Sequence, residues 1–512
     1  MSPYVLAAAT AGVVIVFLHA IKSHRSRKLP PSPWSLPLVG HLYRLGGLAH
    51  RSLHELQTRY GGGLLFLQLG RRPTLVVSTA AAAADLLKHH DLAFASRPHS
   101  VAGDKLMYGC SSVSFAPYGD KWRRAKKIAV VHLLSQRRVE SFAAVRAAEA
   151  AALVALAHRA AAAGEAVDLR ESLYGYTNAL FTRAATGAAG ATAEKLRQMM
   201  GNSVALLVGF QPEDVLPDAP ARLVRWATGL EKKLDHEAQA WDRFLSELVA
   251  AHQEKKKPDR AGGDDEDFLD VLLRLKEEED GDGHGLTEDG IKAIIKDMIA
   301  SAIETSYTLE WTMVELVVNP RVMAKLQDEI AQAAADDCQP VIISESHLNK
   351  MGYLKAVLKE VLRLHPPAPL LVPHESTEPA AVQGYEIPAG TALFINAWAI
   401  GRDPAAWDVP GEFRPERFVG GGAATVDFKG TDYQLIPFGA GRRICPGISF
   451  AMSAVEVALV GLLQHFDWEL PAGMRLADLD MGEAPGLVAP LRVPLVLVPK
   501  SKTTTLAEAQ LQ

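Results

Sequence analysis

The sequence contains the stretch Phe438-Gly-Ala-Gly-Arg-Arg-Ile-Cys-Pro-Gly447, which sets one cysteine in a glycine-framed turn before an apolar helical pattern. This arrangement suits a haem whose iron is held by a thiolate, because a thiolate pushes electron density toward the iron and favours O–O cleavage. Cys445 is the predicted ligand, and the dipole of the helix that follows it favours the ionised thiol. Gly441 and Gly447 leave room for the backbone to approach a flat macrocycle, since a side chain there would collide with it.

The same stretch matches a known family signature. The pattern F-x-x-G-x-R-x-C-x-G is met by Phe438, Gly441, Arg443, Cys445 and Gly447, and on these residues the chain resembles the cytochrome P450 family. The resemblance implies a haem b cofactor, with Cys445 as the axial ligand of the iron and Arg443 paired with a haem propionate. For a lone cysteine, a loop with a buried structural cysteine would be the simpler interpretation, but the full pattern argues against it. A dinucleotide-binding turn fails, because Ile444 replaces the third glycine of G-x-G-x-x-G.

Two further motifs follow in the order expected for the family. Glu360-Val-Leu-Arg363 matches E-x-x-R, and its charged residues lie three apart on one face of a predicted helix. Such pairs are common and weak on protein surfaces, but Arg417 lies further on in Phe413-Arg-Pro-Glu-Arg-Phe418, which matches the family's P-E-R-F segment. The resemblance implies that Glu360, Arg363 and Arg417 form a buried ion network behind the haem, a role that suits planar Arg–carboxylate pairing.

A long predicted helix carries Ser301-Ala-Ile-Glu-Thr305, which resembles the family's oxygen-activation motif. By this resemblance Thr305 supports a hydrogen-bonded water at the oxygen, and Glu304 supplies protons as a general acid. Alternatively, the threonine bonds a carbonyl one turn back and bends the helix. Ala302 stands where the family usually has glycine, and its methyl group adds to helix stability.

Three other residues are expected near the haem propionates. Trp122 and Lys126 resemble a W-x-x-x-R pattern in which lysine replaces arginine. The indole N–H of Trp122 can donate to a propionate, and Lys126 would supply a point charge. His374 lies where relatives place an Arg or His near the other propionate, although an ordinary loop histidine is the alternative.

Substrate-facing segments can be assigned only by region. The resemblance indicates four of them: the loop over about 99–118, the long helix at Ile299, Ile303 and Thr305, the turn Ala368 to Val372, and the loop Ala484 to Leu487. Each of these residues could equally pack in the core.

The first 21 residues differ from the rest of the chain. The segment from Tyr4 to Ile21 is nearly all apolar and spans about 27 Å as a helix, close to the thickness of a bilayer core. The basic cluster Lys22 to Lys28 predicts that this flank stays in the cytosol. We expect a transmembrane signal anchor over 1–21, a basic stop and proline-rich hinge over 22–40, contact with membrane lipid, and an endoplasmic reticulum location. A cleaved signal peptide is disfavoured, because the basic cluster follows the apolar run.

The composition is that of an ordinary globular protein, with 48% hydrophobic and 22% charged residues. A net charge of −5 gives no basic footprint for nucleic acid. We expect a mainly α fold with a minor β portion, in one haem-binding domain over 41–500 with a flexible tail over 501–512. Strands are predicted at Leu64–Leu69, Thr74–Val77, Leu370–Val372 and Ala392–Ile395, and helices at 136–165, Phe268–Leu275 and Thr287–Leu316.

These features together resemble the large plant microsomal group of the family. They predict a membrane-anchored haem-thiolate monooxygenase that inserts one atom of O₂ into an apolar small molecule, a plant specialised metabolite of indolic, terpenoid, phenolic or oxime type. Electrons are expected from a separate NADPH–cytochrome P450 reductase, because the sequence shows no flavin or NADPH module. A peroxide-rearranging isomerase or dehydratase and a non-catalytic haem sensor are the alternatives. Thr305 argues against the first, and the anchor together with Glu304 and Thr305 argues against the second.

Overall fold

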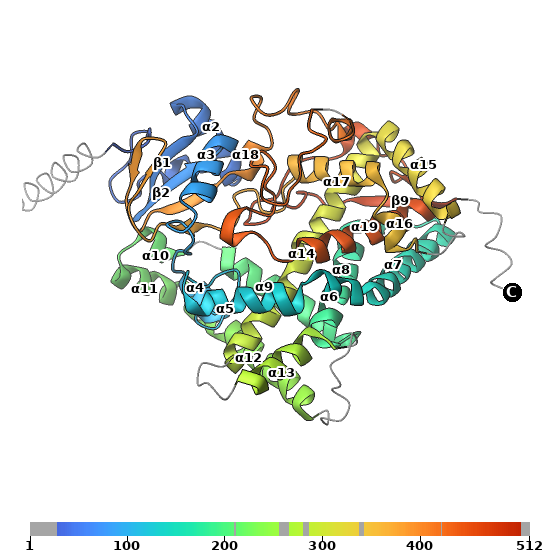
Figure 1. The fold of residues 1–512 in the computed structure, drawn as a ribbon, viewed down its shortest axis with the longest axis horizontal. Helices are drawn as coiled ribbons and strands as arrows, with labels where there is room; N and C mark the ends of the chain where they lie inside the picture. The colour runs from blue at the N-terminus through green and yellow to red at the C-terminus, as the bar shows by residue number, and fades with distance from the viewer. Residues whose placement is uncertain are drawn as a thin grey trace, which may run out of the picture.

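The computed structural model describes residues 28–208, 211–254, 266–279, 286–336, 342–420 and 422–502. The predicted anchor over 1–21, nearly all of the basic cluster and most of the predicted tail lie outside the described residues. Within the described ranges the fold is mainly helical with a minor β portion, as the sequence predicts (Figure 1).

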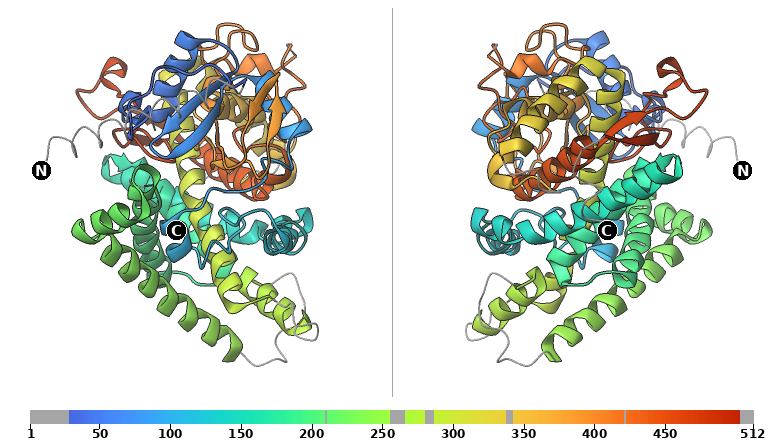
Figure 2. Two further views of the ribbon diagram at one scale, coloured as in Figure 1. Left: turned by 90° about the vertical axis from the view of Figure 1, so that its left-hand side faces the viewer. Right: turned by 90° about the vertical axis from the view of Figure 1, so that its right-hand side faces the viewer.

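The helix α14 (Glu288–Val318) runs through the middle of the molecule, between the lower, green helices and the upper part of the fold (Figure 2). Its first turn is capped by Thr287, whose hydroxyl accepts from the Gly290 amide at 3.1 Å. Two acidic residues in this turn interact favourably with the positive end of the helix dipole. It ends at Asn319, just before a proline. The prediction of one long helix is confirmed, with an end two residues later than expected.

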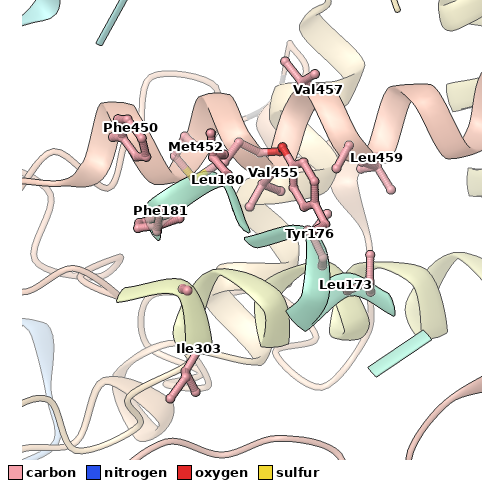
Figure 3. Packing of buried hydrophobic residues seen from close by; sticks show 14 of the residues in the cluster. Leu173, Tyr176, Leu180, Phe181, Ile303, Phe450, Met452, Val455, Val457 and Leu459 are labelled. Atoms are coloured by element: carbon pink, nitrogen blue, oxygen red, sulfur yellow. The ribbon is translucent and has the colours of Figure 1, made fainter. Parts of the chain in front are cut away.

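The helices α8 (Leu169–Thr186), α17 (Gly352–Leu364) and α19 (Ile448–His465) pack against α14, and α7 (Ala143–Ala163) packs in turn against α8 and α19. The side chains of α8 and α19 interdigitate beside α14 (Figure 3). The Phe450 ring packs edge-on against Phe181 at 5.0 Å between centroids, and the buried Tyr176 hydroxyl donates to the Ala454 carbonyl at 2.9 Å. This packing fixes the start of α19, which directly follows Cys445.

In the described part of the chain, α19 is the one helix long and apolar enough to cross a membrane. Two thirds of its apolar window, 67%, is buried inside the fold. It is therefore a core helix.

Within the residues that the structure describes, the strands form three small sheets. The largest has the order β1-β2-β7-β4, with β1 (Leu64–Leu69), β2 (Arg72–Val77), β7 (Ala392–Ile395) and β4 (His374–Glu375). Strands β1 and β2 are antiparallel, and β2 pairs in parallel with β7 in the register Thr74 to Ala392. The second sheet has the order β3-β9-β8, with β3 (Val167–Asp168), β9 (Val496–Ser501) and β8 (Phe466–Glu469), and the third pairs β5 (Ala380–Val382) with β6 (Tyr385–Ile387).

One predicted strand is wrong. The apolar run Leu370–Val372 forms a turn, in which Leu371 has a left-handed φ of +53°. Prolines at 366, 367 and 369 explain the difference, since they remove amide donors and fix φ, which a paired strand cannot accommodate.

The other helices complete the body. They are α2 (Ala49–Tyr60), α3 (Ala80–Ala84), α4 (Val101–Leu106), α5 (Asp120–Ile128), α6 (Gln136–Ser141), α9 (Ala191–Val208), α10 (Pro212–Val215), α11 (Asp218–Ala227), α12 (Leu230–Glu254), α13 (Phe268–Glu279), α15 (Pro320–Asp336), α16 (Glu345–Leu348) and α18 (Ala397–Ile400). Shorter helical turns are η1 (Leu42–Arg44), η2 (Asp85–His89), η3 (Ala129–Leu133), η5 (Pro415–Phe418), η6 (Gly441–Arg443) and η7 (Leu476–Asp478).

Candidate functional site

The loop before α19 is closed around Cys445. The backbone amide of Cys445 donates to the Phe438 carbonyl at 3.0 Å, and the Gly447 amide donates to Cys445 Sγ at 3.4 Å. Burial raises the pKa of the Cys445 thiol, while the Gly447 amide and the Lys126 ammonium oppose that shift. A metal cation bound to a thiol deprotonates it outright, so the loop is suited to holding a sulfur ligand.

The positions 441 and 447 differ in how strictly they need glycine. Gly441 has a φ of +65°, and a Cβ there would lie 2.5 Å from Asp91 Oδ1 and 2.8 Å from the Leu87 carbonyl oxygen. Glycine is thus required at 441 by the contact with η2 and Asp91. A Cβ at 447 would meet Cys445 Sγ at an ordinary 3.8 Å, so the space at 447 lies next to the sulfur.

Cys445 borders a cavity between α14 and the start of α19. The cavity is lined by groups from several separate parts of the chain, among them Val113, Ser114, Asp297, Ser301, Glu304, Thr305, Thr308, Pro367, Ala368, Leu371, Val372, His374, Phe438, Arg443, Cys445 and Phe450. Trp122, Lys126, Gly447 and Arg97 also line it. All the residues predicted near the propionates, and both predicted proton-handling residues, therefore share one cavity with Cys445.

Arg443 and Trp122 form a stacked pair. The guanidinium carbon of Arg443 lies 4.2 Å from the centroid of the indole ring, and its Nε and Nη2 donate to the carbonyls of Ala95 and Ala116, both at 2.6 Å. The indole N–H of Trp122 donates to the Val113 carbonyl at 3.1 Å. The structure thus gives this N–H a protein acceptor, where the sequence analysis expected a propionate.

A second buried arginine, Arg97, was missed by the sequence analysis. It is 7% exposed, and it donates to the carbonyls of Ser114 at 2.9 Å and Pro373 at 2.8 Å. Burial, followed by the nearby Arg443 charge, holds its pKa well below the usual range. No motif flags this position, because the β-bridge between Ser96 and Glu375 brings it into place.

Lys126 and His374 complete the basic side of the cavity. Lys126 donates to the Ile444 carbonyl, and burial lowers its pKa to about 8 despite the attraction of Cys445. His374 donates from Nδ1 to the Phe94 carbonyl at 2.9 Å. Burial and the Arg97 charge hold its pKa well below the usual range, so the ring is neutral and presents Nε2 as an acceptor.

This donor set fits a haem. Arg97 and Arg443 are each less than a tenth exposed, and burial lowers the pKa of Arg443 to about 10. Buried cations are stabilised by a partner of opposite charge, and the two carboxylates of a haem would supply one. A single thiol beside a cluster of buried cations suits thiolate-ligated iron better than a structural zinc site, which takes four protein ligands.

The face of α14 that lines the cavity carries hydroxyls and two acids. The hydroxyls of Ser301, Thr305 and Thr308 each donate to the carbonyl one turn back, the Thr305 bond to Ser301 measuring 2.8 Å. The oxygens of these hydroxyls remain acceptors on the cavity side. Ala302 is fully buried, and α14 continues through it without interruption.

Glu304 is an acid held away from solvent. Its Oε2 has no hydrogen-bond partner among the described residues, and burial raises its pKa to about 7, with a smaller contribution from Asp297. Near neutral pH about half of such groups are protonated, which suits general acid chemistry.

Asp297 was also missed. It lies seven residues before Glu304, and two helical turns put both acids on one face of α14. It accepts from the Ser114 amide at 3.0 Å, and burial raises its pKa to about 6. The helical repeat alone could have identified it as a cavity residue. Ile299 and Ile303, for which the sequence left the cavity and the core equally open, are not among the residues that line the cavity and pack in the main hydrophobic cluster.

The structure brings Glu360, Arg363 and Arg417 together. Arg363 donates to both carboxylate oxygens of Glu360, at 2.7 and 2.8 Å, and Arg417 Nε donates to Oε1 at 2.9 Å. Glu360 also accepts from the Arg414 backbone amide at 2.8 Å. The side chains of Glu360 and Arg363 are 0% exposed and that of Arg417 is 5% exposed. The bonds from Arg417 and from the Arg414 amide join α17 to η5, while the Arg363 bonds lie within α17.

Comparisons with known proteins find relatives that match nearly the whole chain. A family model described as Cytochrome P450 matches residues 30–493. The chain is 42% identical to "Cytochrome P450 71A9" of Glycine max, with 91% of each chain covered. It is 40% identical to a tryptamine 5-hydroxylase of Oryza sativa subsp. japonica (96% of this chain, 94% of the relative) and 41% identical to an indolin-2-one monooxygenase of Zea mays (94% and 91%). The solved structure of a zebra fish cytochrome P450 with progesterone is similar, with a TM-score of 0.73, 25% identity, and coverage of 88% of this chain and 99% of that one.

Proposed function

Because this chain belongs to the cytochrome P450 family and is a haem-dependent monooxygenase, we propose that Cys445 is the axial ligand of a haem b in the cavity before α19. The observation that carries the proposal is the placement of the Cys445 thiol in one cavity with a cluster of buried cations and with Glu304 and Thr305. The haem, when bound, supplies O₂ activation and insertion of one oxygen atom into the substrate.

The chain's own residues would hold the haem and supply protons. Arg443, Arg97 and Lys126 offset the charge of the propionates, with Trp122 as the platform for Arg443 and His374 beside them. Phe438 and Gly447 shape the space at the sulfur. Thr305 would keep a water at its hydroxyl oxygen, and Glu304 would release a proton from its carboxyl group toward that water. Glu360, Arg363 and Arg417 would hold the segments behind the haem.

The proposed substrate is an apolar small molecule, which the enzyme hydroxylates. Val113, Leu371 and Val372 add apolar groups to the lining of the cavity beside its hydroxyl and acid groups. Relatives at nearly equal identity are named for tryptamine, indolin-2-one and menthofuran, so a plant specialised metabolite is the proposed class. Sequence identity does not favour one of these compounds over another.

Electrons would come from NADPH through a separate cytochrome P450 reductase. We also propose that residues 1–21 anchor the protein in the endoplasmic reticulum membrane, that 22–40 link the anchor to a cytosolic haem domain over 41–500, and that 501–512 form a tail. Support comes from the apolar run and the basic cluster in the sequence. Protease applied to intact microsomes should digest the body, and full protection would refute this topology.

The test of function uses the purified full-length protein. The ferrous–CO complex should show the absorption of a thiolate-ligated haem, and Cys445→Ala should abolish it. A library of plant metabolites is then screened by spectral binding, and each binder is incubated with NADPH, O₂ and reductase. NADPH-dependent oxygen insertion supports the monooxygenase. Turnover of a peroxide without NADPH would favour the isomerase or dehydratase, and binding without any turnover would favour a haem sensor.

A further inference from the structure

Two cavity-bordering segments meet at a buried tryptophan outside the cavity. Trp311 lies one turn beyond Thr308 on α14 and is 1% exposed. Its indole Nε1 donates to the Ala489 carbonyl at 2.9 Å, and the Ala489 amide donates to the Pro367 carbonyl at 2.9 Å. Pro367 lines the cavity. Two successive hydrogen bonds therefore connect α14 to the cavity wall.

The indole ring of Trp311 also packs against the chain just before this part of the cavity wall. It stacks on His365 with centroids 3.8 Å apart and planes 7° from parallel. His365 donates from Nε2 to Glu315 at 2.7 Å, and this bond holds the imidazole ring against α14. Trp311 thus touches the residue before Pro366 directly and reaches Pro367 through Ala489.

The turn that Trp311 holds is a strained one. Leu371 has a φ of +53°, which residues other than glycine adopt only at an energetic cost, and it lines the cavity. The turn is closed by the Leu371 amide, which donates to the Ala368 carbonyl at 3.0 Å. A strained backbone persists only where its surroundings fix it.

The hairpin that presents Ala489 is anchored independently at its base. The buried Glu483 carboxylate accepts from His50 and Arg51, both at 2.8 Å, and from the Trp398 indole at 3.1 Å. Backbone bonds from Ala484 to Pro490 and from Arg492 to Gly482 close the hairpin. In the described part of the chain the cavity lining does not include 484–487. The hairpin therefore supports the cavity wall from outside the cavity. The sequence had indicated that 484–487 could contact substrate or pack in the core.

We propose that Trp311 is a positioning residue that sets the distance between α14 and the cavity wall at 367–372, and thereby the size of ligand that the cavity accepts. This rests on the proposed function of the cavity as the haem and substrate site. Phenylalanine at 311 would keep a ring against His365 and would leave the Ala489 carbonyl buried without its donor, so the hairpin and the wall would loosen together.

The test compares Trp311→Phe with Trp241→Phe in the full-length holoprotein. Trp241 is a matched control, because it is also 1% exposed and its indole donates to Ser203 and Glu237, at 2.7 and 3.0 Å, away from this wall. Two readouts are measured: hydrogen–deuterium exchange over 484–490, and spectral dissociation constants for imidazole and for the larger phenylimidazole, which both bind haem iron through nitrogen.

Trp311→Phe should speed exchange at the Ala489 amide about tenfold and change the phenylimidazole-to-imidazole affinity ratio at least threefold, while Trp241→Phe changes neither. An unchanged ratio or unchanged exchange at 484–490 would overturn the inference. If Trp311→Phe does not fold, benzothienylalanine incorporated at 311 removes the N–H and keeps the ring shape. If the wild-type protein binds neither azole, the proposed haem function fails, and the exchange measurement alone then decides the role of Trp311.

Discussion

Replacing Glu360 by glutamine should destabilise the protein strongly. The carboxylate accepts two hydrogen bonds from Arg363, one from Arg417 and one from the Arg414 amide. An amide offers one acceptor oxygen, and its NH₂ group would face guanidinium donors. Both arginines keep carbonyl partners, Gly401 and Pro410 for Arg363 and Asp408 for Arg417, but they lose the only opposite charge in the triad.

The expected loss is about 3–5 kcal/mol, which is the usual result of leaving a buried charge uncompensated. A domain has roughly 5–15 kcal/mol of stability in total, so Glu360→Gln should remove about a fifth of it or more. Loss of the thiolate-haem spectrum in urea provides the assay. With an m value of about 3 kcal/mol/M, the midpoint should fall by about 1 M or more.

The matched control is Asp478→Asn. Arg475 pairs with Asp478 through the same two-pronged geometry, at 2.9 and 3.1 Å, but that arginine side chain is 79% exposed. Exposed pairs contribute little because water screens them, so the midpoint should stay within error. Equal shifts for Glu360→Gln and Asp478→Asn would refute the reasoning from burial.

Three further predictions concern protons. Thr305→Ala should leave haem content and ligand binding nearly unchanged and lower the product formed per NADPH, with hydrogen peroxide rising instead; full coupling in this variant would show that another group supports the proton transfer. Because the pKa of Glu304 is raised to about 7, product per NADPH should fall as pH rises through about 7, and a Glu304→Gln variant with the same pH dependence would contradict that role. The pKa of His252 is raised above 6.5: burial lowers it, but the 3.0 Å hydrogen bond to Asp267, the charges of Asp267 and Asp270 and the bond to the Leu248 carbonyl together outweigh burial. The stability contributed by this pair should be complete below about pH 6.5 and lost as pH rises through the raised value, and a stability gap between wild type and His252→Phe that is constant with pH would be evidence against it.

The sequence identified the parts of the site that local patterns encode. The loop around Cys445 and the helix carrying Glu304 and Thr305 are contiguous motifs, so their relative positions follow from a turn and a helical repeat. The family order of motifs also placed Glu360 beside Arg417. The strand at Leu64–Leu69 is confirmed with the predicted ends.

The remaining features depend on tertiary contacts that no local pattern records. Arg97 reaches the cavity because the bridge between Ser96 and Glu375 joins distant segments. The acceptor of the Trp122 indole is a carbonyl in a loop whose position is set partly by Asp297. For Ile299 and Ile303 the sequence left cavity and core equally open, because an apolar helix gives no sign of which side meets the cavity, and the structure favours the core.

The parallel pairing of β2 with β7 has a consequence for biosynthesis. Thr74 pairs with Ala392, 318 residues later in the chain, and ribosomes add about 5–20 residues per second. An edge of β2 therefore stays without its partner for about 15–60 s after it leaves the ribosome, and an unpaired strand edge is a template for aggregation. The cysteine loop is made later still, so chaperones must protect the nascent chain before any cofactor can enter.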